Sequence, residues 1–336
     1  MINELKCNEA FMQLKKILII RFSSIGDIVL TTPIIRCAKQ QLIGIEIHFV
    51  TKNIFKDTLI NNPYLDKLVT FNQDVTEVFA ELKAENYDVV IDLHKNLRSL
   101  RLKQHLNTKS FSFNKINLQK FLAVNFKLKN SLPKQHIVER YFETIANIDV
   151  KPDNKGLDYF LSEADYVNCT DLFFNALHTQ FIALVVGGSY YTKQIPLNKL
   201  IEICKNAPLP IVILGSKDDK QIAEELQKNF PNAINTCGSF SINQSASIIS
   251  QAEWVITSDT GLMHIASAFN KKIISVWGNT IPEFGMSPYL PNAQNKIVQV
   301  NNLSCRPCSK LGYRKCPKSH FKCMNDLDFS LIVKQL

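Results

Sequence analysis

The sequence predicts an α/β protein made of two doubly wound domains, each with a parallel sheet at its centre. Short apolar runs alternate with stretches whose apolar residues recur at helical spacing, a pattern typical of parallel sheets covered on both faces. The pattern stops at the polar segment 149–155 (DVKPDNK) and then starts again, which indicates a linker. The length of 336 residues is also comfortable for two domains.

The first half of the chain forms the N-terminal domain, which we place at residues 1–155. Its first strand is expected at residues 16–22 (KILIIRF), followed by a Ser-Gly turn and a helix from residue 28 to residue 42. Further strands are expected at residues 46–51, 66–71 and 88–93, with polar helical segments between them.

The second half forms a C-terminal domain, placed at residues 156–300, and a Cys-rich tail at residues 301–336. Strands are expected at residues 181–187, 210–215, 233–237, 253–259 and 273–278. Four helices are expected between these strands. The first begins at about residue 196, the second spans residues 218–230, the third ends at about residue 252, and the fourth begins at residue 260. Two doubly wound domains in one chain imply a ligand cleft between them, facing the carboxyl ends of the strands.

The composition, with 46% hydrophobic and 21% charged residues, is ordinary for a soluble globular protein, and two further observations lead us to expect a cytoplasmic one. No apolar run approaches the roughly 18–20 residues that a membrane span needs. The first sixteen residues lack the apolar core and small-residue cleavage site of a secretion signal. The nine cysteines are therefore expected to be reduced thiols or metal ligands instead of disulfides.

Basic residues are concentrated in residues 95–140, here called the basic block. This block holds eleven Lys or Arg and one acid, Glu139, so its net charge exceeds the +9 of the whole chain. Such a block indicates a surface for an anionic partner such as phosphorylated lipid, membrane headgroups or nucleic acid; a solvated face that aids solubility is the alternative. No nucleic-acid-binding module accompanies it, which argues against nucleic acid.

The motif SSIGDIVLTTP, at residues 23–33, directly follows the first strand. Gly26 permits a tight turn, and Asp27 stands where a helix should begin. A carboxylate there can cap the helix or project into the cleft as a general base, and the residues alone leave both roles open. The G-x-G-x-x-G fingerprint of dinucleotide binding is absent.

Two motifs of the second half suit a nucleotide. In VVGGSYYTKQIP (residues 185–196), Gly187, Gly188 and Ser189 form a small-residue loop, and Lys193 offers a point charge for a diphosphate unless it is a surface lysine. In PIVILGSKDDKQIAEEL (residues 210–226), Gly215 precedes two acids. Asp218 suits a helix cap, and Asp219 is the better candidate for ribose hydroxyls.

The sharpest motif is WVITSDTGLMHIASAF, at residues 254–269. Asp259, Thr260 and Gly261 follow a buried strand and begin a helix that carries His264 in its first turns. Free N–H groups at a helix start, with a hydroxyl and a glycine, make an anion site suited to a diphosphate. His264 then contacts phosphate or sugar, or has only a local structural partner.

The segment DVVIDLHKNLRS, at residues 88–99, places polar side chains after another strand. His94 follows this strand, and Lys95 and Arg98 lie beside the expected cleft. We assign Lys95 and Arg98 to acceptor phosphate or carboxylate groups, with plain surface charge as the alternative.

Four cysteines of the tail are spaced C-x2-C-x7-C-x6-C. They are Cys305, Cys308, Cys316 and Cys323. Four thiolates can hold a tetrahedral structural zinc, although paired spacing is usually tighter, and a cluster of reduced thiols is the alternative.

Taken together, these stretches resemble glycosyltransferase family 9, the ADP-heptose:lipopolysaccharide heptosyltransferases. The resemblance runs from about residue 16 to residue 277. It implies the GT-B fold of two facing Rossmann-like domains and a nucleotide-sugar donor, ADP-heptose. It also implies heptose transfer with inversion to an anionic glycolipid, the inner core of lipopolysaccharide, at the cytoplasmic face of the inner membrane. The enzyme would associate peripherally with that membrane, need no catalytic metal and carry a Cys-rich tail as a family feature.

The resemblance also implies roles for individual residues. Asp27 matches the general base, and Lys193 matches the lysine that neutralises the departing diphosphate. Asp219 matches an acid that binds the ribose. The positions that match contacts with the phosphates and the sugar are Gly188, Ser189, Asp259, Thr260, Gly261 and His264. The sequence has Lys193-Gln194-Ile195-Pro196 where K-x-W-P is commoner, so the bracing of this loop is open. Another nucleotide sugar, or a GT-B nucleotide-sugar epimerase or hydrolase, is the alternative function.

Overall fold

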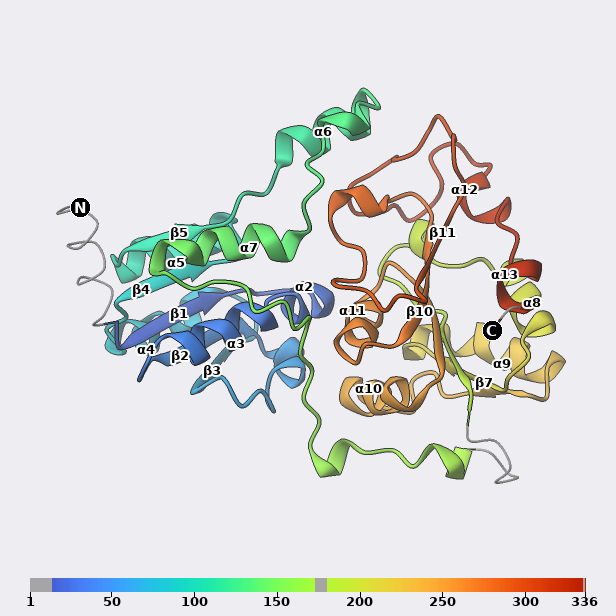
Figure 1. Ribbon diagram of the computed structural model, residues 1–336, viewed down its shortest axis with the longest axis horizontal. Helices are drawn as coiled ribbons and strands as arrows, with labels where there is room; N and C mark the ends of the chain where they lie inside the picture. The colour runs from blue at the N-terminus through green and yellow to red at the C-terminus, as the bar shows by residue number, and fades with distance from the viewer. Residues whose placement is uncertain (1–13, 173–179, 335) are drawn as a thin grey trace. The chain divides into compact units, whose positions relative to one another are not determined.

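The computed structural model describes residues 14–172, 180–334 and 336, which divide into two compact units. The first unit comprises the chain up to Lys115 together with Gln135–Phe160. The second comprises Ile116–Lys134 and the chain from Leu161 onward. Each unit is built on its own parallel sheet with helices on both faces (Figure 1), which confirms the predicted α/β class.

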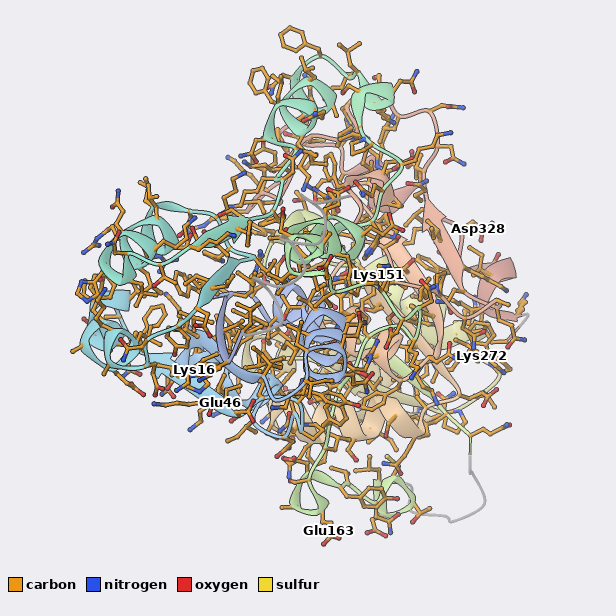
Figure 2. All side chains as sticks on the ribbon, turned by 60° about the vertical axis from the view of Figure 1, so that its left-hand side comes forward. Lys16, Glu46, Lys151, Glu163, Lys272 and Asp328 are labelled. Atoms are coloured by element: carbon orange, nitrogen blue, oxygen red, sulfur yellow. The ribbon has the colours of Figure 1, made fainter. Side chains whose placement is uncertain are left out.

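The sheet of the first unit has five parallel strands in the order β3-β2-β1-β4-β5. They are β1 (Lys16–Ile20), β2 (Glu46–Lys52), β3 (Lys67–Phe71), β4 (Val89–Asp92) and β5 (Ser110–Ser112). Central β1 is fully buried after its first residue, as expected for a strand covered on both faces. Lys16 and Glu46 are partners in the β1–β2 register and form an ion pair with 3.1 Å between Nζ and Oε2 (Figure 2).

The helices of the first unit are α2 (Ile25–Val29), α3 (Thr32–Gln41), α4 (Phe79–Ala84), α5 (Leu97–Leu106) and α7 (Ile137–Ile145). The single helix expected from residue 28 to 42 is therefore split. Pro33 lies in the first turn of α3, where its missing N–H costs nothing, but it could not continue a helix from α2. Arg36 of α3 holds the linker through a two-pronged contact with Asp153 and a further contact with Asp158.

The sheet of the second unit has six parallel strands in the order β11-β10-β9-β6-β7-β8. They are β6 (Ile182–Val185), β7 (Ile211–Leu214), β8 (Ala233–Asn235), β9 (Trp254–Ser258), β10 (Lys272–Trp277) and β11 (Lys296–Gln299). Alternate residues of β6 point to opposite faces. Ile182 and Leu184 join one apolar cluster, and Ala183 and Val185 join the other.

The helices that cover this sheet are α8 (Leu197–Asn206), α9 (Lys220–Asn229), α10 (Ile242–Gln251), α11 (Gly261–Ala268), α12 (Lys322–Asn325) and α13 (Ser330–Lys334). The cluster on one face includes residues of α8, α9, α12 and α13, and that on the other includes residues of α10 and α11. The tail thus contributes to the core of the second unit through α12 and α13.

The segment Ile116–Lys134, here called the arm, belongs to the second unit although it interrupts the first in sequence. It contains α6 (Asn117–Asn125) and a short 3-10 turn, Lys129–Ser131 (Figure 1). Ile116, Ala123 and Leu132 are buried against Ile281 and Phe284. Long-range apolar contacts therefore decide the placement of the arm.

Candidate active site

The sequence motifs lie where strand order reverses in each sheet. In a doubly wound sheet, the loop after the first strand and the loop after the fourth strand run toward opposite faces of the sheet. These two loops therefore diverge and leave a crevice at the carboxyl ends of the strands. In the first unit this point lies between β1 and β4, which lead to Asp27 and to His94–Arg98. In the second unit it lies between β6 and β9, which lead to Lys193 and to Asp259.

Asp27 is a charged carboxylate held from two sides. Its Oδ1 lies 2.7 Å from Nη2 of Arg21, and its Oδ2 accepts hydrogen bonds from N and Oγ of Ser24, at 3.3 and 3.0 Å. Burial acts to raise the pKa of Asp27, but the Arg21 charge and the Ser24 hydrogen bonds outweigh it and keep the pKa below its ordinary value. With 23% of its side chain exposed, Asp27 is both a helix-start partner and an accessible anion.

Arg21 is a site residue that sequence reasoning missed. Its side chain is 9% exposed, and its guanidinium donates to the backbone oxygens of Ser23 and Leu93 and to Oη of Tyr141. These bonds fix the guanidinium so that one nitrogen faces Asp27. The sequence did contain a signal for Arg21, because it directly follows the apolar residues of the first strand, and a buried charge there needs a partner.

His94 and Arg98 both pack on Phe22, beside Arg21. The His94 ring lies 4.9 Å from the Phe22 ring, and the Arg98 guanidinium lies 5.8 Å from the centroid of that ring. Burial, and then the charges of Arg21 and Lys115, lower the pKa of His94 to about 3, so this imidazole is neutral near pH 7. Lys95 is exposed in the same loop, and its N–H donates to Asp92 at 2.6 Å.

Lys193 and Asp259 are brought together in the second unit from two different loops. Lys193 Nζ lies 2.7 Å from Asp259 Oδ2, which also accepts a hydrogen bond from Thr280 Oγ1 at 3.1 Å. The lysine comes from the 3-10 turn Tyr191–Lys193 after β6, and the aspartate lies between β9 and α11. The predicted phosphate lysine thus faces the predicted donor loop.

The small residues around this pair bring the β6 and β9 loops close together. A Cβ added at Gly188 would lie 3.9 Å from both Ser258 and Thr260 side chains. Thr260 caps α11, because its Oγ1 accepts from the N–H of Met263 at 3.4 Å. Gly261 begins the helix, His264 is buried in it at 2% exposure, and Ser189 is exposed in the facing loop. α11 therefore begins two residues after Asp259, the partner of Lys193, and a helix start next to a lysine suits an anion.

Asp219 takes the helix-start role that was expected of Asp218. Its Oδ2 accepts from N and Oγ of Ser216, at 2.8 and 2.7 Å, whereas Asp218 is exposed. Assigning the cap to Asp218 was therefore wrong. A Cβ on Gly187 would lie only 2.5 Å from Asp219 Oδ2, so this glycine lets the carboxylate approach the β6 loop.

Two polar residues that the sequence analysis overlooked lie at the same strand ends. Ser258 and Asn279, each 1% exposed, end β9 and follow β10. Within the described residues, Ser258 Oγ and the Asn279 amide atoms have no hydrogen-bond partner. Leaving such groups unsatisfied costs about 1–3 kcal/mol each, which a polar ligand would offset. Their signal in sequence was a polar side chain just after a buried strand.

The sequence matches the profile described as glycosyltransferase family 9 (heptosyltransferase) over residues 75–317. The chain belongs to glycosyltransferase family 9. Its predicted family and its nature as an enzyme are thereby confirmed. The lipopolysaccharide heptosyltransferase 1 of Campylobacter coli is 25% identical over 295 residues, covering 79% of this chain and 84% of that relative.

Solved structures of related proteins show the fold of this glycosyltransferase. The family 9 glycosyltransferase of Veillonella parvula gives a TM-score of 0.71 at 18% identity, covering 84% of this chain and 85% of that one. The Escherichia coli ADP-heptose lps heptosyltransferase II gives 0.67 at 16% identity, covering 96% and 100%. The fold of the chain is GT-B, as predicted.

The tail of the transferase braces the loop that carries Lys193. Thr192, 1% exposed, donates from its N–H to Tyr313 O at 3.2 Å and accepts at Oγ1 from the Tyr313 N–H at 2.8 Å. Tyr191 stacks on Phe321 with ring centroids 5.1 Å apart. These contacts hold the loop that lacks the tryptophan of K-x-W-P.

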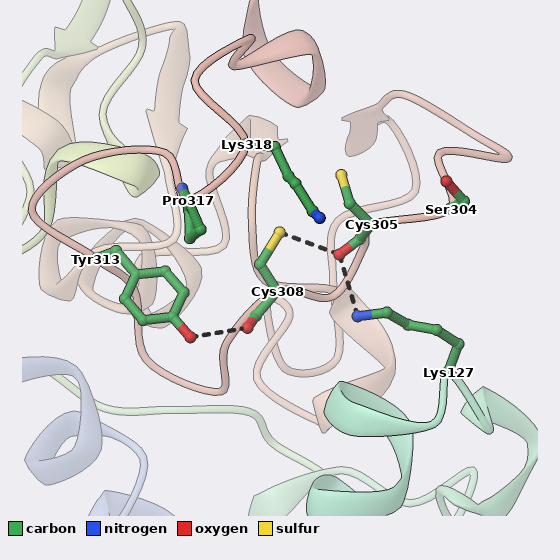
Figure 3. A pocket seen from close by; sticks show the side chains of 7 residues that line it. All are labelled: Lys127, Ser304, Cys305, Cys308, Tyr313, Pro317 and Lys318. Atoms are coloured by element: carbon green, nitrogen blue, oxygen red, sulfur yellow. Dashed lines mark hydrogen bonds between the residues drawn. The ribbon is translucent and has the colours of Figure 1, made fainter.

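The four tail cysteines of the transferase do not form a metal site as they stand. Cys308 Sγ donates to Cys305 O at 3.0 Å (Figure 3). Cys305 Sγ lies 4.0 Å from Nε2 of His320. Among residues 14–172, 180–334 and 336, no group of three His, Cys, Asp or Glu side chains is arranged to hold a metal ion. Cys316 and Cys323 likewise contribute no such arrangement, so the predicted zinc site does not fit this geometry.

Proposed function

We propose that this family 9 enzyme transfers heptose from ADP-heptose to the inner core of lipopolysaccharide, with inversion at the anomeric carbon. The observation that carries the proposal is the Lys193–Asp259–Thr280 cluster at the strand-order reversal of the second sheet. A diphosphate placed there would take over Lys193 as its counter-ion and meet the first-turn amides of α11. The names of the relatives support heptose as the sugar and ADP as the nucleotide.

The donor side of the proposed reaction is assigned to the second unit. Lys193 offsets the charge that grows on the leaving ADP, so the residues supply what a metal ion would otherwise supply. Asp219 binds the ribose, and Asp259 orients the lysine and the sugar. The remaining contacts to phosphate and sugar come from Gly188, Ser189, Ser258, Thr260, Gly261, His264 and Asn279.

The acceptor side is assigned to the first unit. Asp27 accepts the proton of the acceptor hydroxyl as the hydroxyl oxygen bonds to the anomeric carbon and the bond from that carbon to the diphosphate oxygen breaks. One displacement inverts the anomeric configuration. Lys95 and Arg98 bind phosphate or carboxylate groups of the acceptor. The acceptor is an anionic glycolipid, so the enzyme would act in the cytoplasm and associate peripherally with the inner membrane.

The decisive experiment measures ADP release from ADP-heptose with and without a defined inner-core acceptor. We expect release only when the acceptor is present and a product whose anomeric centre is inverted, as read by nuclear magnetic resonance. UDP-sugars should give little UDP. Equal release without acceptor would instead indicate a hydrolase or epimerase, and preference for another nucleotide sugar would overturn the donor assignment.

A further inference from the structure

The arm has an outer face of large apolar side chains that are open to solvent. Leu118, Phe121, Phe126 and Leu128 are 66, 54, 62 and 54% exposed. The Phe121 and Phe126 rings lie 6.0 Å apart, edge to face, so they form one patch. The inner side of the arm already packs in the core of the second unit. A second, solvent-exposed apolar face therefore indicates a further binding partner.

The charge of the arm indicates which partner suits this face. Residues 116–134 contain four lysines and no acid, and the acid-free stretch extends from residue 93 to residue 138. The lysines are Lys120, Lys127, Lys129 and Lys134. Apolar side chains that include aromatic rings, set among lysines, are complementary to an anionic bilayer surface.

The arm is also firmly attached to the donor-binding unit. Lys127 Nζ donates to the backbone oxygens of Val124 at 2.7 Å and Pro307 at 2.8 Å. It also donates to the backbone oxygen of Cys305 at 3.2 Å (Figure 3). The last two belong to the tail, beside a pocket of about 390 Å³. Burial of Ile116, Ala123 and Leu132 fixes the other side of the arm. The exposed face is therefore presented by a fixed element.

We propose that the outer face of the arm docks onto an anionic phospholipid bilayer. Leu118, Phe121, Phe126 and Leu128 enter the boundary between headgroups and acyl chains, and Lys129 and Lys134 meet lipid phosphates, whereas Lys127 is held by the tail and Lys120 lies over the Phe284 ring. This inference assigns the membrane contact to the arm. It depends on the proposed function in one respect, namely that the acceptor is a membrane lipid. Because lipid binding is measured apart from transfer, either can fail alone.

The test is co-sedimentation of the full-length protein with vesicles of phosphatidylethanolamine and phosphatidylglycerol. We expect binding that weakens in high salt and on vesicles of phosphatidylcholine alone. The double variant Phe121→Ser/Phe126→Ser should lose at least about tenfold in vesicle affinity, because both changes remove exposed rings. The control Ile43→Ser/Ile297→Ser, which alters residues 99 and 52% exposed outside the arm, should bind like the wild type.

A second measurement keeps the two proposals separate. Transfer to a soluble, delipidated acceptor should be unchanged in Phe121→Ser/Phe126→Ser, whereas a failure of the wild type in that assay would count against the proposed function only. Unchanged vesicle binding in the double variant, or no binding by the wild type, overturns the docking proposal. Conversion of a dimer to a monomer by the double variant, seen by light scattering, would assign the face to a second copy and also overturn it.

Discussion

At the scale of single residues, the surroundings of Asp27 suit a general base, because a positive charge from Arg21 lies beside its carboxylate. The Arg21 guanidinium keeps the carboxylate ionised, and Arg21 itself is fixed by backbone oxygens and Tyr141. A carboxylate with a lowered pKa is a weak base toward a free hydroxyl. It accepts the proton only as the hydroxyl oxygen becomes acidic during bond formation, which suits a concerted displacement.

Asp27→Asn should lower kcat by about 10²–10⁴-fold, because the amide cannot accept the proton. ADP affinity, measured by calorimetry, should stay within about twofold of the wild type, since the proposed donor residues are in the other unit. Asp74→Asn serves as the control, because Asp74 is also paired with an arginine, Arg101, but is exposed. An Asp27→Asn enzyme with full turnover would rule out the base assignment.

His94 should make the protein less stable in mild acid. Its folded-state pKa of about 3 lies below the roughly 6.5 of the unfolded chain, so the unfolded state binds more protons between these values. The free energy of unfolding should thus fall as pH drops from about 6.5, by up to roughly 1.4 kcal/mol per pH unit from this group.

Denaturant titrations between about pH 4.5 and 6.5 test this slope, because most carboxylates in the unfolded chain are still ionised there. His94→Gln should reduce the slope, and His48→Gln should reduce it independently, since burial also lowers the pKa of His48. An identical slope in His94→Gln and the wild type would show that His94 does not titrate in this way.

At the scale of elements, the tail and the Lys193 loop act together. The 3-10 turn Tyr191–Lys193 is too short to fix itself, and its restraint comes from Tyr313 and Phe321 in the tail. Sequence reasoning identified the lysine but left the brace open, because the bracing residues lie far along the chain.

Thr192→Val should loosen this loop without changing its volume much. The Tyr313 N–H would lose its acceptor, at a cost of about 1–3 kcal/mol, and Lys193 would be held less well. We expect kcat to fall about 5–30-fold and ADP binding to weaken, whereas Thr192→Ser, which keeps the hydroxyl, should restore both. Equal kcat and ADP affinity in Thr192→Val and the wild type would mean that the brace has no part in positioning Lys193.

At the scale of the whole molecule, much of the fold follows from local pattern. The nine strands expected from apolar runs include β1 and β9, whose residues are buried on both faces of their sheets. Edge strands β5 and β11 escaped prediction because they are short and partly exposed, so they lack an apolar run. The arm escaped because its contacts with Ile281 and Phe284 leave no local trace.

The placement of the candidate site residues was partly predictable. Asp27, Lys193 and Asp259 follow β1, β6 and β9, as expected from motifs at the carboxyl ends of parallel strands, and their roles stay predictions. The ion pairs were not predictable. The partner of Asp27 depends on the hydrogen bonds that fix Arg21, whereas the cap by Asp219 follows the local spacing Ser216-x-x-Asp219 and could have been read from the sequence.

The complete enzyme should work without a divalent metal ion. The Lys193 charge and the α11 amides are assigned to neutralise the leaving ADP, so transfer rates should be unchanged after treatment with EDTA. Lys193→Ala should lower kcat by about 10²–10³-fold, the typical loss of one preorganised charge-stabilising group. Loss of activity in EDTA, restored by Mg²⁺, would contradict this assignment.

The arm also has a consequence for how the chain is made. A ribosome adds roughly 5–20 residues per second, and the arm emerges well before Ile281 and Phe284, against which it packs. During that interval both apolar sides of α6 are uncovered. We therefore expect the nascent chain to expose the apolar side chains of this helix until most of the second sheet has been synthesised.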